Sequence, residues 1–304
     1  MQLDISENSI PVYEVLSSPT RINIIKLLSK KKMNIGELAK ELNISSAIVS
    51  RHITKMNDAG LVKTETVPGK SGLQKVVILK VDRIEIQFPQ KIYSAYESYK
   101  QEIPVGHYSH FDVHPTCGLA TTIKTIGEYD DPKYFMDPQK NQAAILWFTK
   151  GFIEYRIPSI LKETDKLEMI DIVLEASSEF PFSNNVWPSD ITFSLNGKEL
   201  CTWTSPGDFS DTRGRFTPDW WPNETNQYGI LLTIRITKHG VYADGKKLSD
   251  LTIDQFREEQ SGMWDLKVEI KEDAENVGGV TLFGKGFGNY DQDINFITYY
   301  SNPV

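Results

Sequence analysis

Cysteine is scarce in this 304-residue chain, which holds only Cys117 and Cys201. Two cysteines cannot build a disulfide framework, and the lack of any Cys-x-x-Cys pair excludes the usual zinc-knuckle and redox motifs. No apolar run approaches the roughly 18 residues of a membrane-spanning helix. Asp4 and Glu7 stand where a signal peptide needs a basic start and an apolar stretch. We therefore expect a cytoplasmic protein with no membrane segment.

Recognised catalytic motifs are missing as well, including the nucleophile elbow, the zinc-protease helix and the phosphate-binding loop. The glycines of residues 284–291 do not follow a strand and open a helix, as a nucleotide-binding loop requires. Acid pairs such as Glu175 with Glu179, or Asp208 with Asp211, could perform glycosidase chemistry. However, the last 224 residues contain 34 acids, so such pairs arise by chance. We expect no enzymatic activity and no cofactor.

Aromatic residues are nearly absent from residues 1–80, where Tyr13 is the single example. This part carries 12 Lys and Arg against 7 Asp and Glu, a balance of +5. The other 224 residues carry 21 against 34, a balance of -13. A chain of 304 residues is long enough for about two domains. We therefore expect a basic, aliphatic first domain that binds a polyanion. An acidic, aromatic second domain with another role should follow it.

Helical spacing predicts three short helices in the basic part. Pro19 occupies the first turn of the first helix. Apolar residues at i, i+3, i+4 and i+7 over residues 35–42 give the second helix one buried face, and Asn43 takes the tight turn that follows. Ser45 is a good N-cap for the third helix, and Gly60 stops it.

The third helix has one apolar face, formed by Val49, Ile53 and Met56, and an opposite face of short or basic residues. Such a face can approach base edges and phosphates. Two strand-like runs, 61–67 and 73–81, follow with a basic tip between them and are interpreted as a wing. The residues expected to contact DNA are Ser45, Ser46, Ala47, Ser50, Arg51, His52, Lys55, Lys70 and Lys75.

Three helices and a wing, with Leu-Asn-Ile-Ser before the third helix, Val-Ser-Arg-His-Ile within it and Ala-Gly-Leu-Val after it, resemble the winged helix-turn-helix of the arsenic-repressor (ArsR) family. The resemblance covers about residues 12–81. It implies a dimeric transcriptional regulator bound to an inverted-repeat operator. Metal-sensing members carry a cysteine pair in the second helix of the motif, whereas residues 34–39 here contain none. A signal, if one exists, must enter elsewhere; the other interpretation is a structural or protein-binding winged unit.

The joint between the domains is assigned to residues 83–104, after a DNA-binding domain of residues 1–82. Tyr93, Tyr96 and Tyr99 lie at helical spacing and predict a helix from about 90 to 102. The tyrosine stripe fits either a seam with a second copy or packing on its own domain.

Strand signals dominate residues 105–304. Eight strand-like runs are expected: 144–148, 152–157, 167–174, 191–195, 230–237, 264–270, 280–283 and 294–300. Asn196-Gly197 and Asp244-Gly245 are typical two-residue hairpin turns. Many strands without intervening helices predict an all-β jelly-roll-like sandwich. Its pattern resembles galactose-binding-like and carbohydrate-binding modules, and the whole order resembles bacterial regulators that fuse a winged unit to such a sandwich.

Two loops, residues 205–221 and 284–291, combine aromatic, acidic and amide side chains. Sugars stack on aromatic faces and need partners for their hydroxyls, because an unpaired buried polar group costs about 1 to 3 kcal/mol. The candidate ligand residues are Asp208, Arg213, Asp219, Trp220, Trp221, Asn289 and Tyr290. The alternative is that the tryptophans cap the core and Arg213 fastens its own loop.

His107, His110, His114 and Cys117 form a histidine-rich segment. In an extended strand, His110, Asp112 and His114 would share one face, which is a conceivable metal site. We expect no metal there, and Cys117 as a small buried apolar residue.

These features predict a dimeric, DNA-binding transcriptional regulator whose sandwich senses a small ligand, most simply a carbohydrate, and changes operator affinity. The alternative is a glycosidase-like or metal-binding sandwich that carries a winged-helix tether.

Overall fold

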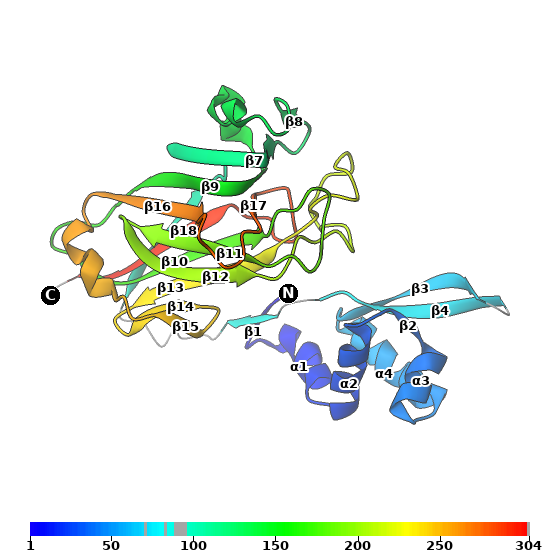
Figure 1. Cartoon of the computed structure of the whole chain (residues 1–304). Coiled ribbons are helices and arrows are strands. Elements are labelled where there is room, and N and C mark those ends of the chain that lie inside the picture. Colours follow the sequence, from blue (N-terminus) through cyan, green and yellow to red (C-terminus); the bar gives the residue numbers. More distant parts are fainter. Residues whose placement is uncertain (70–71, 82–83, 88–95, 303–304) are drawn as a thin grey trace. The chain divides into compact units, whose positions relative to one another are not determined.

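The computed structural model describes residues 1–69, 72–81, 84–87 and 96–302 and divides the chain into two compact units, Met1–Ser94 and Ala95–Val304 (Figure 1). Lys70 lies outside the described residues, as does the part of the predicted linker helix that contains Tyr93.

The first unit is helical with two small sheets. Its helices are the 3₁₀ turn η1 (Glu7–Ser9), α1 (Ile10–Leu16), α2 (Pro19–Leu28), α3 (Ile35–Leu42) and α4 (Ser46–Asp58). One sheet has the order β2 (Met33–Asn34), β4 (Gly72–Leu79), β3 (Val62–Gly69), and β1 (Gln2–Asp4) pairs in parallel with β5 (Glu85–Gln87). The three predicted helices and the β3–β4 wing are confirmed.

Side-chain caps fix the starts of α3 and α4. The Asn34 side chain accepts a hydrogen bond from the Glu37 N–H at 2.9 Å, and the Glu37 carboxylate accepts one from the Asn34 N–H at 2.8 Å. This capping box satisfies two N–H groups that a helix start otherwise leaves free. Ser45 accepts from the Ile48 N–H at 3.3 Å and caps α4. Between these helices Asn43 adopts the left-handed conformation, with φ 52°.

A single apolar core holds the helices of this unit together. It includes Leu38 and Ala39 from α3 and Val49, Ile53 and Met56 from α4, all buried. Ile44, inside the turn, packs against the same core. The predicted apolar faces of α3 and α4 are therefore the faces that meet.

The second unit is built almost entirely of antiparallel strands. Its strands are β6 (Glu97–Ile103), β7 (His110–Ala120), β8 (Thr125–Ile126), β9 (Ile145–Pro158), β10 (Lys166–Ser177), β11 (Ser189–Leu195), β12 (Lys198–Ser205), β13 (Ile230–Thr237), β14 (Gly240–Ala243), β15 (Lys246–Ser249), β16 (Met263–Ile270), β17 (Val280–Phe283) and β18 (Ile294–Ser301). Short 3₁₀ segments are η2 (Pro132–Met136), η3 (Pro138–Gln142) and η4 (Ile253–Glu259).

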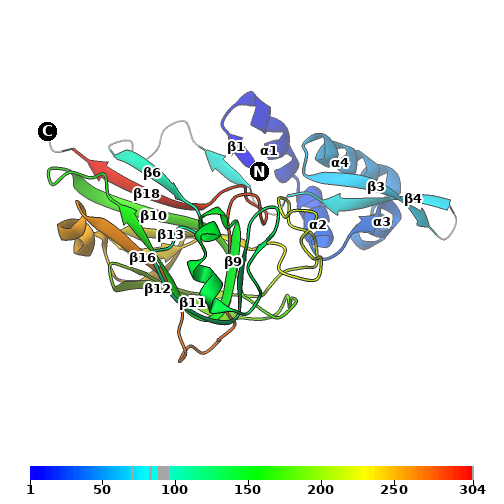
Figure 2. The same ribbon diagram turned by 90° about the horizontal axis from the view of Figure 1, so that it is seen from above.

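These strands form one continuous sheet that bends over itself into two layers (Figures 1 and 2). One layer runs β7-β9-β16-β11-β12, the other runs β6-β18-β10-β13-β14-β15, and β17 joins them by pairing with both β9 and β10. Strand β12 also approaches β14 and β15, so the sandwich is nearly closed into a barrel. This is the predicted all-β sandwich.

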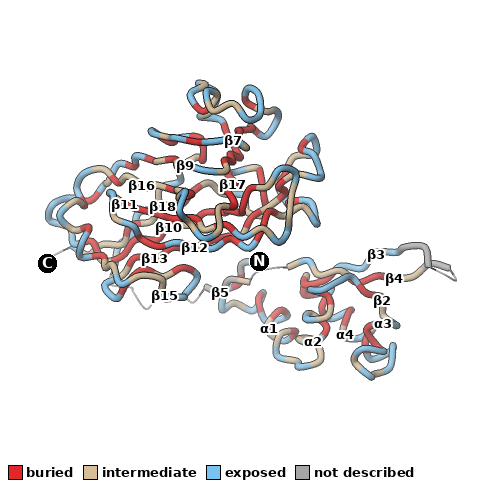
Figure 3. Tube along the Cα trace, viewed as in Figure 1, coloured by how far each residue is buried: buried red, intermediate tan, exposed pale blue. Residues whose placement is uncertain are grey.

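Alternating burial along the strands places the main core between the layers (Figure 3). Leu146 and Phe148 of β9 point into this core, whereas Ile145 and Trp147 point to the other face of the sheet. There they form a second apolar cluster with Trp221, Phe283 and others. The loops that contain the candidate ligand residues cover this second face.

The predicted hairpin turns are confirmed. Asn196 and Gly197, between β11 and β12, have φ of 49° and 73°, and Asp244 and Gly245, between β14 and β15, have φ of 45° and 84°. Two positive φ values in succession are the signature of the turn that matches the twist of a hairpin.

The prediction of a linker helix is wrong for the residues that the structure describes, because residues 97–103 form strand β6. This strand pairs with β18 over seven positions, from Ile103↔Ile294 to Glu97↔Tyr300. Pairing across the sheet therefore overrides the helical spacing of Tyr96 and Tyr99, a spacing that tertiary contacts commonly overrule. The predicted runs 144–148 and 152–157 are also one strand, β9, which passes through Gly151.

The left-handed turn at Asn43 yields a stability prediction. Asn43→Val is expected to lower the free energy of unfolding by about 1 to 2 kcal/mol, because a branched Cβ clashes in this conformation. Asn43→Gly is the matched control and should remain near the wild type. Chemical denaturation of both variants checks this, and equal stabilities for the two variants would refute it.

Candidate nucleic-acid interface and ligand-binding loops

The candidate DNA interface is the exposed side of α4 together with the wing. The first turn of α4 presents Ser45, Ser46 and Ala47, all exposed, and Arg51 is exposed one turn later. Ser50 and His52 are partly exposed at the flanks. Lys75 is exposed on β4. The structure thus brings the described members of the predicted set onto one helix and the adjoining hairpin.

His52 lies on α4 beside two cationic groups. Partial burial, then Arg21 and Arg51, lower the pKa of His52 below its usual 6.5. The imidazole is therefore neutral at pH 7, and it can donate one hydrogen bond and accept another. Arg21 itself donates to the Val15 carbonyl oxygen at 3.0 Å, which fastens α2 to the end of α1.

Lys55 is engaged with another side chain. Its ammonium lies 2.6 Å from the Glu14 carboxylate of α1, and this pairing lowers the pKa of Glu14. Both side chains are about half exposed, at 49% and 53%. Exposed pairs contribute little, with a typical range of about 0 to 1 kcal/mol, so a phosphate can compete for Lys55 at small cost.

Sequence reasoning missed Ile48, which is 45% exposed in the first turn of α4. Val49, its neighbour, belongs to the core, and the periodic pattern assigns Ile48 to neither face. The sequence did contain a signal for its exposure. Ile48 immediately precedes the core residue Val49, and successive residues on an α-helix are about 100° apart, so Ile48 lies to the side of the face that Val49 buries.

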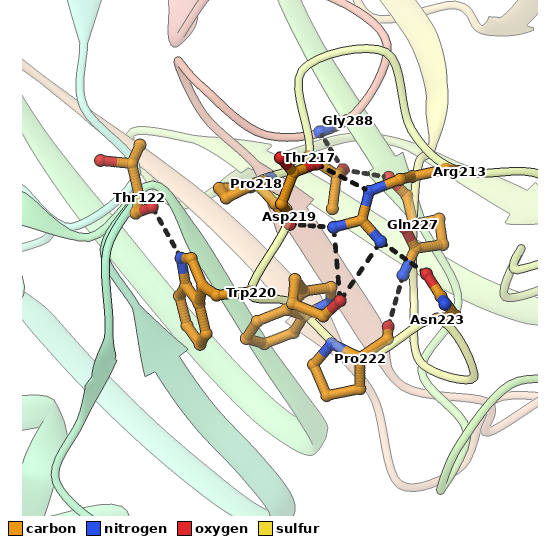
Figure 4. Close-up of polar contacts among 11 residues, drawn as sticks. Thr122, Arg213, Thr217, Pro218, Asp219, Trp220, Pro222, Asn223, Gln227 and Gly288 are labelled. Carbon is orange, nitrogen blue, oxygen red and sulfur yellow. Dashed lines mark hydrogen bonds and ion pairs between the residues drawn. The ribbon is translucent and has the colours of Figure 1, made fainter.

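The candidate ligand loops do lie together, but most of their polar groups are used internally. Arg213 donates to the Asn223 side chain at 2.6 Å, to the Trp221 carbonyl oxygen at 3.3 Å and to the Pro218 carbonyl oxygen (Figure 4). The carboxylate of Asp219 lies 3.9 Å from Arg213 Nε. Arg213 thus fastens residues 213–223 into one compact loop.

The two adjacent tryptophans have different environments. Trp221 is 3% exposed, packs edge-to-face on Trp147 and Phe287, and donates from Nε1 to the Asn226 carbonyl oxygen at 3.0 Å. Trp220 is 38% exposed, and its Nε1 donates to the Thr122 carbonyl oxygen at 2.7 Å (Figure 4). Trp221 is part of the second apolar cluster, and Trp220 is partly exposed to solvent.

Asn289 and Tyr290 are positioned by a buried carboxylate that sequence reasoning treated as a chance acid. Glu175, on β10, accepts hydrogen bonds from the N–H groups of Gly229 at 2.8 Å, Asn289 at 2.8 Å and Tyr290 at 3.0 Å. A Cβ at Gly288 would stand 2.3 Å from the same carboxylate, and its φ of 72° is a conformation that favours glycine. Glu175 therefore anchors the loop of residues 284–291 to the sheet.

Asp208 and Glu179 are buried acids of the same unit. Asp208 accepts from the Phe180 N–H at 3.3 Å through Oδ2, while Oδ1 has no partner among the described residues. Burial raises the pKa of Asp208 to about 8. Glu179 accepts from Thr116, Thr281 and Asn226, and burial followed by the charge of Asp208 raises its pKa well above 4.5. Asp208 is thus a buried group of the loop region and offers no exposed surface.

The histidine-rich segment forms strand β7 from His110 onward. His110, Asp112 and His114 alternate along its exposed face, and His110 Nδ1 lies 3.4 Å from the Glu154 carboxylate. Cys117 is buried, as predicted. In the portion of the chain that the structure describes, no three His, Cys, Asp or Glu side chains are grouped to hold a metal ion. No helix in that portion is long and apolar enough to cross a membrane.

The buried acid Asp208 yields a pH prediction. Its folded pKa of about 8 lies above the ordinary value of 3.8, so the unfolded carboxyl ionises first as the pH rises. Between pH 3.8 and pH 8 the contribution of Asp208 to the free energy of unfolding falls as the pH rises, by up to about 1.4 kcal/mol per pH unit. Asp208→Asn should therefore flatten the decline in the free energy of unfolding between pH 5 and pH 7.5, measured with urea.

The exposed Asp219 provides the matched control, since Asp219→Asn should leave the decline unchanged. An Asp208→Asn variant that keeps the full wild-type decline would show that Asp208 does not titrate in this range.

Comparisons with known proteins agree with the geometry of the first unit. The family model described as "Bacterial regulatory protein, arsR family" matches residues 18–64. An uncharacterized HTH-type transcriptional regulator from Methanocaldococcus jannaschii is 46% identical over 54 residues, which are 18% of this chain and 57% of that protein. The chain thus spans little more than half the length of this curated relative, and the residues that the family model matches lie within the first unit. Residues 18–64 are a helix-turn-helix domain of the arsR family.

Proposed function

We propose that the chain is a DNA-binding transcriptional regulator that inserts α4 into the major groove. The observation that carries this proposal is the two-sided character of α4: its inner face is fixed in the core by Val49, Ile53 and Met56, and its outer face is short, polar or basic apart from Ile48. Phosphate contacts position such a helix, and base-edge contacts specify the sequence. The name of the Methanocaldococcus jannaschii relative supports the same role.

The proposed regulator binds as a homodimer, so that its operator is an inverted repeat. Two-fold symmetry of a helix-turn-helix dimer is mirrored in the two halves of its site. The wing supplies phosphate contacts through Lys75, which is exposed on β4.

In this proposal the sandwich senses a small ligand, a carbohydrate, and has no catalytic role. Support comes from the partial exposure of Trp220 next to the exposed carboxylate of Asp219, on a loop whose backbone Arg213 binds. Rigid loops lose little conformational entropy on binding. The proposal assigns the main contacts to Trp220 and Asp219, because Trp221 and Asp208 are buried and Arg213 is bound within its own loop. Asn289 and Tyr290, which are partly exposed, stay in the proposed set.

Two substitutions in the proposed interface should have different effects on DNA binding. Arg51→Ala should cost about 1 to 3 kcal/mol on the preferred sequence and relax the preference at one base position. Lys75→Ala should weaken all sequences alike and reduce the slope of log K against log salt by about 1. Fluorescence-anisotropy titrations of the full chain on a selected and a scrambled duplex at several salt concentrations measure both effects.

Lys26→Ala, an exposed lysine on α2, is the control for a general loss of positive charge. The proposal fails if the wild-type chain shows no salt-sensitive preference for any duplex.

The sensing role predicts a coupled response to sugar. A panel of mono- and disaccharides should contain one that changes tryptophan fluorescence and shifts the Kd for DNA, and DNA must shift the Kd for that sugar by the same factor. Trp220→Ala should remove the fluorescence response and keep the fold. Trp221→Ala should instead cost about 3 to 5 kcal/mol of stability, as expected for a buried aromatic residue. A Trp220→Ala variant that keeps the full response would contradict this assignment.

A further inference from the structure

Ile48 is an apolar side chain displayed on an otherwise polar surface. The other large apolar residues of α4, Val49, Ile53 and Met56, are at most 3% exposed, whereas Ile48 is 45% exposed. Ile44, one turn earlier, packs against the core of the unit, and Ile48 does not belong to that packed set. The fold therefore gives Ile48 no packing role that explains an isoleucine.

The backbone of Ile48 is held in place by the helix cap. Its N–H donates to the Ser45 hydroxyl at 3.3 Å, so it occupies the third position of α4. Exposed Ala47 precedes it and exposed Arg51 follows it by three residues, a spacing at which side chains on a helix are neighbours. Ile48 therefore lies within the part of α4 that the proposed function places against base edges.

The major groove offers one apolar group of substantial size to such a side chain. Base edges there present mainly hydrogen-bonding atoms, and the largest apolar group among them is the C5 methyl group of thymine. Isoleucine suits this contact, because in a helix it strongly prefers one χ1 rotamer and loses little freedom when it is fixed.

We propose that Ile48 reads the C5 methyl group of a thymine and thereby sets a preference for thymine at one position of the DNA site. The proposal rests on the proposed DNA-binding function. With Ile48, a residue that determines sequence specificity lies between the small Ala47 and the cationic Arg51. One turn of α4 would then recognise bases both by an apolar contact and by hydrogen bonds.

The test removes only the methyl group. A preferred duplex is first selected from random sequences with the full chain, and each thymine is then replaced singly by deoxyuridine, which lacks the C5 methyl. Kd values are measured for the wild type, Ile48→Ala and Ile10→Ala. Ile10 is the matched control, since it is 46% exposed on α1 of the same unit.

At one position the replacement should weaken wild-type binding about fourfold, the factor expected for the loss of one buried methyl group. Ile10→Ala should show the same loss, and Ile48→Ala should show none at that position. An Ile48→Ala variant with the same losses as the wild type at every position would overturn the proposal.

Other failures are distinguishable from this one. If Ile48→Ala changes only the oligomeric state in sedimentation while the deoxyuridine losses persist, the side chain contacts a second copy and the proposal is wrong. If selection yields no preferred duplex, the DNA-binding function itself fails, and the methyl readout fails with it.

Discussion

The left-handed turn at Asn43 is the constraint on which the candidate DNA interface depends. It reverses the chain between α3 and α4, and the Ile44 N–H closes it by donating to the Ala39 carbonyl oxygen at 3.1 Å. With the turn fixed, the apolar faces of α3 and α4 can meet in only one way. Every side chain of α4 that does not face this core is then presented outward, and the composition of that outer surface determines what the domain can bind.

The sandwich follows a different rule, in which buried carboxylates organise surface loops. Glu175 accepts hydrogen bonds from three backbone N–H groups in two loops, and Glu179 accepts them from the side chains of Thr116, Thr281 and Asn226. Each bond joins segments far apart in the sequence. The loops are thereby held at a fixed distance from the sheet, which leaves few of their polar groups for a ligand and limits the exposed aromatic surface to positions such as Trp220.

Local signals predicted those parts of the fold that local physics determines. The cap at Ser45, the left-handed Asn43 and the Asn-Gly and Asp-Gly turns depend on a few adjacent residues, and all are present in the structure. Strand β6 was predicted as helix because its neighbour β18 is almost 200 positions away, and no local pattern reveals such pairing.

The candidate sites show the same difference between what local sequence signals can and cannot predict. The α4 face follows from periodicity, because a helix that buries one side must expose the other. The roles of Arg213 and Trp221 could not be assigned from composition, because an arginine that binds backbone carbonyls and one that binds a ligand have the same sequence signature. Ile48 was not predicted as a contact residue, because an apolar residue beside a core residue is usually assumed to belong to the core.

The central claim is that the outer face of α4 is the surface that meets DNA. Its most direct test is the titration of the isotope-labelled full chain with a selected duplex, followed by NMR of the backbone amides. The account predicts that the largest shifts occur at residues 45–55 and along the wing. Shifts confined to the sandwich, or shifts at residues 45–55 that are no larger than those elsewhere in the chain, would contradict it.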